Sequence, residues 1–539
     1  MRARSLALSA LLSLVACAGR PGGEGDVEIS ADASANPAVG SVATLDAAIA
    51  EHWRTAGVTP AAQADDAAFL RRVSLDLIGR VPTAEEVEAF LSDDDPDKRA
   101  TRVDALLAGD EHAEHWAQLW ASVLLPASDK AQRLAEAPLE RYLSQAILDN
   151  RPWDQVVEGM LVGEGPIDQN PALAYLGARA GRAGDREAAT AELTSTTARV
   201  FLGARIECAQ CHDHPYVDFS REDFWATAAY FGRTAVSLDR EQKPPKVEVF
   251  ERRAGELRLA LNGEADPRKR VIAPRYMGED QTLDRDASRR VSLADRITAD
   301  PRFDQATVGQ VWSRLFGAGI VDPWDDLLVQ TEVPPLLATL AADFREHDHD
   351  LRHLLRTIVL SQAYQRSAAG SEGDAKADRA RVAAFAQAAV RPMSAEQLFA
   401  SLLTATGLEQ VRNRRFKQAV RQRKQLALRE FEFVIDDDEM AAGPDGFTAG
   451  VPQALLLLNG ALSNQGVIAR EGSSLARILD AHTDTDGRLR ALWLTVYGRP
   501  PRSDELALGR DAVGDGDDVQ HWEDLMFAMV YSAEFSSNH

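Results

Sequence analysis

The chain has 539 residues and a formal net charge of −23 at pH 7. This length exceeds that of one ordinary domain and predicts several structural units. The excess of Asp and Glu excludes a general nucleic-acid-binding role, because phosphate contacts need a basic face, and it suits cationic protein partners.

The first residues have the pattern of an export signal. Arg2 and Arg4 precede an apolar run, residues 6–14, that is too short to span a bilayer as a mature helix. Leu-Val-Ala then precedes Cys17, and this resembles the bacterial lipoprotein cleavage site, where the cysteine is lipidated. Because Ala18 is not the Asp that retains lipoproteins at the inner membrane, we expect an outer-membrane anchor. The alternative is an ordinary signal peptide that is cut elsewhere.

The rest of the chain divides by composition and periodicity. Residues 1–16 form the signal peptide, and residues 17–44 are rich in small and polar residues, which predicts a flexible tether. Helical periodicity dominates residues 45–235 and 285–539. We therefore expect a mainly α fold in which two helical domains are joined by a short β-hairpin and linker at residues 236–284.

Local signals mark helices in the first domain. Apolar residues recur on one helical face from Phe69 to Leu77, and Thr83 with Glu86 has the spacing of a capping box. Longer amphipathic stretches cover residues 99–125 and 139–162. These patterns predict a packed set of helices.

Between the two domains the period changes to two. Residues 246–250 and 256–261 alternate apolar and polar side chains, and Gly255 lies between them. This pattern predicts two strands that pair as a hairpin around residues 253–255.

One sequence pattern occurs twice. Residues 79–87 and 498–506 both begin with Gly-Arg, continue through proline and end in acidic residues before an apolar one. Glycine ends a helix and acidic residues suit the next N-terminus, so capping rules alone predict a recurring helix joint. A true internal duplication is the alternative.

Cys208 and Cys211 are separated by two intervening residues, and His212 follows directly. Two thiols at this spacing can add to the two vinyl groups of one porphyrin while the next imidazole binds the iron. The other cysteine in the chain is Cys17, which the signal pattern explains. Because haem attachment takes place on the exported side, compartment and motif agree on a c-type haem.

The surrounding residues suggest how this haem would sit. Residues 192–207 predict a helix whose face with Val200 and Phe201 carries Cys208 at its end, beside an apolar wall. His212 would be the proximal ligand, since His214 is too close to reach the opposite face. The candidates for a distal ligand, with an open position as the alternative, are His115, Met160 and Met277.

Two other sites fit the same residues. In an oxidising compartment, Cys208 and Cys211 can form a structural disulfide or a redox-active pair. Together with His212, and with Asp213 or His214, they can also bind zinc, because thiolate and imidazole suit that ion.

Three longer segments, residues 69–83, 151–154 and 200–215, resemble the planctomycete cytochrome-c-like domain family. This resemblance spans about residues 45–233 and implies a haem on the cysteine motif.

The C-terminal part, including residues 311–322 and 453–460, resembles the domain of unknown function that usually accompanies this family.

Other polar clusters carry weaker signals. His349 and His353 are four residues apart before an apolar helix, with His347 nearby, so they suggest a surface metal pair. The alternative is a solvated helix start with Asp350 as the N-cap, which we favour.

The sequence therefore predicts a cell-envelope lipoprotein, attached to the membrane by its N-terminal lipid, that acts as a haem-binding electron-transfer or redox-partner component. Its redox or envelope partner stays unidentified. The alternatives are a non-haem scaffold lipoprotein and an enzyme acting on an extracellular polymer. The enzyme would need a cleft that gathers Asp322, Asp325 and Asp326, and no catalytic residue is assigned.

Overall fold

A computed structural model describes residues 37–125, 132–180, 186–239, 241–242, 245–253, 255–259, 270–279, 283, 288–370, 374–408 and 466–539. The predicted signal peptide, Cys17 and residues 453–460 lie outside these ranges. None of the helices within them combines the length and the apolar character that a membrane span needs.

The fold is mainly α, as predicted. The helices of the first half, in chain order, are α1 (Pro37–Ala56), α2 (Asp66–Ile78), α3 (Ala84–Ser92), α4 (Lys98–Leu107), α5 (Asp110–Leu124), α6 (Gln132–Leu148), α7 (Trp153–Leu161), η1 (Pro171–Leu173), α8 (Ala174–Ala180), α9 (Arg186–Leu202), η2 (Glu207–Gln210) and α10 (Arg221–Ala228). Each of the two long predicted stretches is two helices. The breaks fall at Gly109 and at Asn150, which has a left-handed φ of 48° and precedes Pro152 by two residues.

The helices of the second half are α11 (Arg289–Ala299), α12 (Pro301–Phe316), η3 (Leu327–Val329), α13 (Pro335–Glu346), α14 (Leu351–Leu360), α15 (Ala375–Ala383), α16 (Ala395–Thr406), α20 (Ser474–Ala481), α21 (Thr485–Tyr497), α22 (Ser503–Val513) and α23 (Val519–Val530). Two predicted N-terminal signals are confirmed. Thr83 and Glu86 form a reciprocal capping box at α3, and Asp350 accepts a hydrogen bond from the backbone N–H of His353 at α14.

The strands are β1 (Gly165–Pro166), β2 (Thr234–Asp239), β3 (Lys246–Glu251), β4 (Leu257–Leu259), β5 (Arg270–Ile272), β6 (Arg391–Pro392) and β7 (Ser537–Asn538). The predicted strands at β3 and β4 exist, but their predicted pairing is wrong. β3 lies between β1 and β2, and β4 pairs with β5. Ion pairs explain the separation of β4, because Glu256 binds both Arg233 and Arg289 and draws the chain toward α11.

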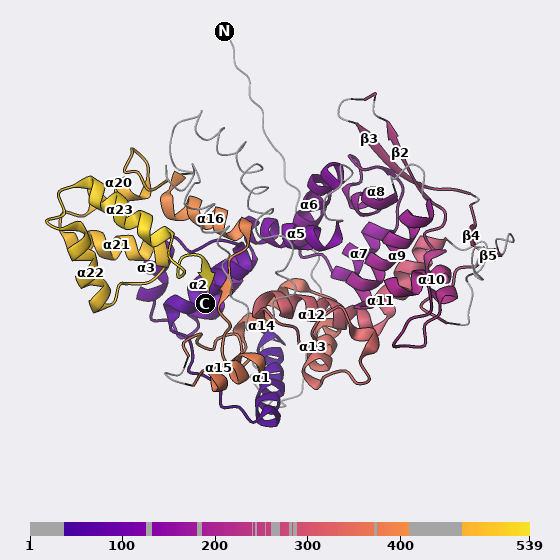
Figure 1. The fold of residues 1–539 in the computed structure, drawn as a ribbon, viewed down its shortest axis with the longest axis horizontal. Helices are drawn as coiled ribbons and strands as arrows, with labels where there is room; N and C mark the ends of the chain where they lie inside the picture. The colour runs from indigo at the N-terminus through magenta and orange to yellow at the C-terminus, as the bar shows by residue number, and fades with distance from the viewer. Residues whose placement is uncertain are drawn as a thin grey trace, which may run out of the picture.

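The packing crosses the predicted linker. One hydrophobic cluster extends from Leu45 to Ala386 and includes Val249 of β3, while a second joins Leu75 and Val81 to residues of the C-terminal helices. Figure 1 shows α3 beside the yellow helix α21, and α1 beside α13 and α14. The proposed domain boundary at residues 236–284 stays a prediction, but the two halves share their cores.

The helix joint predicted twice occurs at both places. Gly79 ends α2 and Gly498 ends α21 in the left-handed conformation, with φ of 72° and 70°. A Cβ on Gly498 would lie 3.4 Å from Pro82 of the other joint, so the two joints pack together. In each, the arginine after the glycine pairs with the glutamate six residues on, as Arg80 with Glu86 and Arg499 with Glu505.

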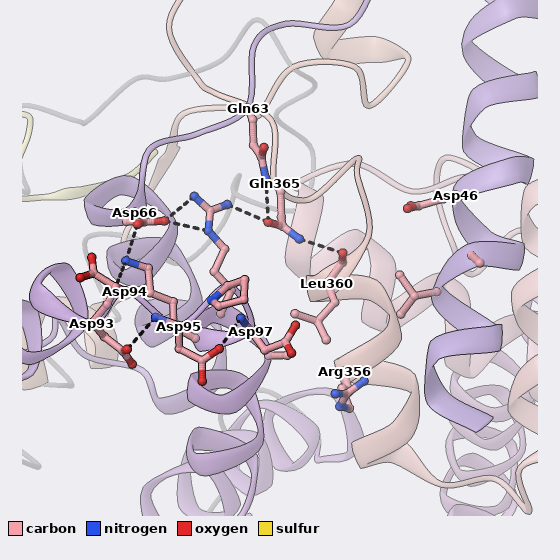
Figure 2. Close-up of a pocket in the computed structure, with 16 residues that line it drawn as sticks. Asp46, Gln63, Asp66, Asp93, Asp94, Asp95, Asp97, Arg356, Leu360 and Gln365 are labelled. Atoms are coloured by element: carbon pink, nitrogen blue, oxygen red, sulfur yellow. Dashed lines mark hydrogen bonds and ion pairs between the residues drawn. The ribbon is translucent and has the colours of Figure 1, made fainter. Parts of the chain in front are cut away.

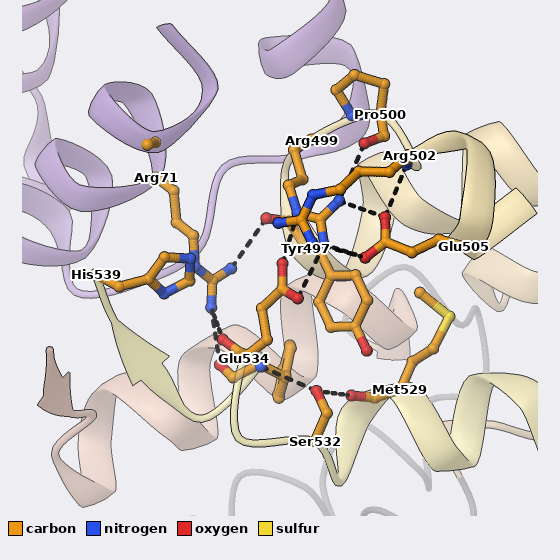
Figure 3. A network of polar contacts seen from close by, with 12 residues as sticks. Arg71, Tyr497, Arg499, Pro500, Arg502, Glu505, Met529, Ser532, Glu534 and His539 are labelled. Carbon is orange, nitrogen blue, oxygen red and sulfur yellow. Dashed lines mark hydrogen bonds and ion pairs between the residues drawn. The ribbon is translucent and has the colours of Figure 1, made fainter. Parts of the chain in front are cut away.

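The segment before the first joint anchors the end of the chain. Figure 3 shows the buried guanidinium of Arg71 donating to backbone carbonyls beside Arg499 and Glu534, at Tyr497 (3.4 Å), Glu534 (3.0 Å) and Phe535 (2.8 Å). One turn on, the buried carboxylate of Asp76 accepts hydrogen bonds from Tyr364, Arg391 and Asn538. Much of the stretch at residues 69–83 therefore has a structural role.

Candidate functional site

The cysteine motif lies on an exposed turn. Helix α9 ends at Leu202, because Gly203 takes a left-handed φ of 56°. The predicted continuation of this helix to residue 207 is therefore wrong. Val200 and Phe201 face the core, whereas Cys208 on η2 and Cys211 directly after it are exposed free thiols. The apolar residues that were expected beside the haem thus lie in the core behind the turn, and they do not surround the thiols.

The two histidines after the cysteines differ in how many of their ring nitrogens form hydrogen bonds. His212 is exposed, and its Nδ1 lies 2.8 Å from the carbonyl oxygen of Asp213. A carbonyl only accepts, so this Nδ1 carries the ring proton and Nε2 keeps its lone pair. A metal-binding histidine is commonly oriented in this way.

His214 has both ring nitrogens in use. Its Nε2 lies 3.1 Å from the carbonyl oxygen of Arg205 and donates to it, and its Nδ1 accepts from the backbone N–H of Tyr216 at 3.3 Å. His214 therefore closes the loop that follows the motif.

Helix α10 fixes the other side of the turn. The indole N–H of Trp225 donates to the carbonyl of Gln210 at 3.0 Å, and the backbone N–H of Arg221 donates to the carboxylate of Asp213 at 2.8 Å. Asp213 thus orients His212 through its backbone carbonyl and binds the start of α10 through its carboxylate. These contacts hold the exposed thiols on a fixed frame.

A loop from the second half of the chain supports the base of the motif. The buried carboxylate of Asp325 pairs with Arg205 at 2.6 Å, and the backbone N–H of Leu327 donates to the carbonyl of Gly203 at 2.8 Å. Asp322 is exposed and Asp326 is half-buried, so the three aspartates do not form an open carboxylate cluster. Their arrangement is structural, and it gives no support to the polymer-degrading alternative.

The three predicted distal ligands differ in position. Met160 is buried in the core, and His115 is buried against the glycine that ends α2. In Figure 1, α2 and α10 lie far apart along the longest axis, so His115 is not beside the motif. Met277 is half-buried, and its backbone N–H donates to Thr227 of α10, the helix that supports the turn. Of the three, Met277 alone belongs to a segment that packs on this helix.

The histidines near α14 form two clusters that the sequence did not predict. His349 lies between Asp304 (3.0 Å) and Asp154 (3.5 Å). Burial alone would lower its pKa, but the hydrogen bonds and charges of the two carboxylates outweigh burial and raise the pKa to about 9. The disfavoured alternative, a metal pair of His349 and His353, is therefore not formed, and Asp350 is the N-cap of α14 as favoured.

His347 and His353 instead meet Asp343. The imidazole rings stack with centroids 3.7 Å apart, and His353 Nε2 lies 2.9 Å from Asp343 Oδ2. Asp343 was missed because it lies inside a predicted helix, although its spacing of four residues from His347 was visible in the sequence.

A cavity of about 800 Å³ is lined by residues of α1, α14 and the acidic loop 93–97 (Figure 2). The carboxylates of Asp93 and Asp95 accept hydrogen bonds from backbone N–H groups two residues on. Asp66 pairs with Lys98 and Arg99. The acidic side chains are thus largely bound within their own loop, and the cavity contains no residue of the cysteine motif.

A haem and a zinc ion make different demands on the residues of the motif. Haem attachment needs two accessible thiols, one for each vinyl group of the porphyrin, and an imidazole with a free ring nitrogen. Cys208 and Cys211 are exposed thiols, and His212 has a free Nε2. A zinc ion would need donor atoms that converge, and these three residues with His214 do not form such a group within 4.8 Å. His214 would also have to give up the hydrogen bond of the ring nitrogen that binds the ion.

Comparison with family models identifies both halves of the chain. Residues 44–236 match PSCyt2, described as a protein of unknown function (DUF1549), and residues 289–513 match PSD1, described as a protein of unknown function (DUF1553). Searches of curated proteins and of solved structures gave no match. The cysteine motif lies in the first matched region, and Asp325, which supports it, lies in the second.

Proposed function

We propose that this chain, a DUF1549 region followed by a DUF1553 region, carries one covalently bound c-type haem and acts as an electron-transfer or redox-partner component of the bacterial cell envelope. Cys208 and Cys211 would form the thioether bonds, and His212 would bind the iron through Nε2. The observation that carries this proposal is the exposed dithiol turn followed by a histidine whose other nitrogen is bound to a backbone carbonyl.

The bound haem would supply reversible one-electron exchange. The protein residues hold it: Asp213 fixes the imidazole of His212, and Trp225 fixes the turn through Gln210. The distal position would be open or filled by a residue such as Met277. An exposed motif favours exchange with a protein partner, because the thiols and His212 are reachable from solvent.

The charges around the turn indicate the kind of partner. Four exposed acidic side chains lie close to the motif in sequence, namely Glu207, Asp213, Asp218 and Glu222. Such a surface attracts a partner with a basic face, and this electrostatic attraction weakens as salt is added. We therefore propose a cationic redox protein as the electron partner.

Membrane attachment would come from the lipid on Cys17, in the outer membrane. The predicted tether, residues 17–44, would link this lipid to the rest of the chain, although its last part is helical because α1 begins at Pro37. A non-haem scaffold lipoprotein with a disulfide between Cys208 and Cys211, or with zinc there, is the alternative.

The test is to express the full chain in a host with periplasmic haem-attachment machinery and to stain a denaturing gel for haem. Thioether bonds survive unfolding, so a haem band should remain with the polypeptide and disappear in Cys208→Ser/Cys211→Ser. Iron and zinc contents measured on the same sample separate the alternatives. A colourless product, free of iron while a control cytochrome matures, would refute the haem proposal.

A further inference from the structure

A cluster of potential metal ligands lies far from the cysteine motif in sequence, where α13 ends and α14 begins. Asp343 is in the last turn of α13, His347 caps this helix, and His353 is in the first turn of α14. One donor atom from each of the three lies within 4.8 Å of the others. In the described ranges, this is the one group of three such side chains that comes so close together.

The hydrogen bonds prepare these side chains for a cation. His347 Nδ1 lies 2.8 Å from the backbone carbonyl of Asp343, so it donates its proton there and leaves Nε2 with a lone pair. His353 Nε2 and Asp343 Oδ2, at 2.9 Å, share one proton that a metal ion can displace. The two imidazole rings stack with their centroids 3.7 Å apart, which brings both close to the carboxylate of Asp343.

An outer contact supports the carboxylate. Ser41 of α1 is buried and donates to Asp343 Oδ1 at 2.5 Å.

The site remains open to solvent. The side chains of Asp343, His347 and His353 are 14%, 27% and 10% exposed. Two imidazoles and one carboxylate with an open fourth position are the ligands that zinc takes in sites with a bound water. Calcium and magnesium are disfavoured, since they prefer oxygen ligands alone.

We propose that Asp343, His347 and His353 bind one divalent transition-metal ion of the zinc class. The ion joins the end of α13 to the start of α14 and, through Ser41 and Asp343, secures α1 against both helices. This site is independent of the haem proposal, because it shares no residue with the cysteine motif.

The test uses the full mature chain with Cys208→Ser/Cys211→Ser, which removes the other thiol ligands. After treatment with a chelator and its removal, Zn²⁺ is titrated by calorimetry and Co²⁺ by its visible absorption. We expect one ion per chain and the release of a proton on binding. His347→Gln and His353→Gln should each weaken binding by more than the roughly 10- to 100-fold that loss of an outer contact costs, and Ser41→Ala should fall in that range.

His349→Asn is the matched control, because this neighbouring histidine is bound to two carboxylates and should leave metal affinity unchanged. Circular dichroism of each variant checks that it folds, and His347→Gln, the more exposed position, serves if His353→Gln unfolds. Absence of Zn²⁺ binding in the starting protein would overturn the proposal. So would binding that survives both glutamine variants or that is lost in His349→Asn.

Discussion

Arg205 pairs with Asp325 across the two matched regions, with 2.6 Å between Nη2 and Oδ1. Arg205 lies three residues before Cys208, and its own carbonyl accepts the hydrogen bond from His214. The DUF1553 region thus supports the loop that carries the cysteine motif of the DUF1549 region. This relationship gives a physical reason why the two regions occur in one chain.

Arg205→Ala should loosen the motif loop. It leaves the buried carboxylate of Asp325 with the more distant Arg199, at 3.9 Å, and an unsatisfied buried acceptor costs about 2 kcal/mol. Native-state hydrogen exchange of residues 203–214 should become faster accordingly. Arg510→Ala, which breaks an exposed pair, is the control and should cost about 1 kcal/mol or less. Unchanged exchange in Arg205→Ala would show that the pair does not stabilise the loop.

His212→Ala and His214→Ala should have different effects on the haem protein. Loss of His212 removes the proposed iron ligand, so we expect a changed reduced spectrum or failed maturation. Loss of His214 removes two loop hydrogen bonds and should leave covalent haem in place. Spectra and haem-stained gels of both variants provide the measurement. If His214→Ala removes bound zinc and His212→Ala does not, the motif is a metal site without haem.

Cys17→Ser should move the protein out of the membrane fraction, as a soluble or unprocessed form. The reason is that the lipid on Cys17 is the proposed anchor. Fractionation followed by immunoblotting is the measurement, with the wild-type chain as the control. Continued membrane attachment of a correctly exported, unlipidated chain would contradict the lipoprotein assignment.

The ion cluster at His349 predicts a stability change at alkaline pH. Its pKa is about 9 in the folded chain and about 6.5 when unfolded, so the protonated form stabilises the fold. The contribution, up to about 3 kcal/mol, is fully present below about pH 6.5 and is lost as pH rises through about 9.

The measurement compares thermal midpoints of wild type and His349→Asn from about pH 6 to pH 10. Asparagine is a suitable replacement because His349 has a left-handed φ of 55°, which asparagine tolerates. The difference in thermal midpoint between the two proteins should become smaller as pH rises. A constant difference in thermal midpoint over this range would mean that the two carboxylates do not keep His349 protonated.

The sequence by itself determined the local features of this protein. The capping box at Thr83, the N-cap at Asp350 and the helix end at Gly79 depend on groups within a few residues of one another, and all three were predicted correctly. The alternation that predicts β3 is equally local. The motif of Cys208, Cys211 and His212 was readable for the same reason.

The tertiary structure decided which distant groups meet. β3 pairs with β2 and β1, and α9 stops at Gly203, where the DUF1553 loop docks. His353 lies close to Asp343 and His347, whereas His349 pairs with Asp304 and Asp154. These outcomes depend on how buried faces and opposite charges from separate helices are satisfied together. A spacing pattern along the chain does not contain that information.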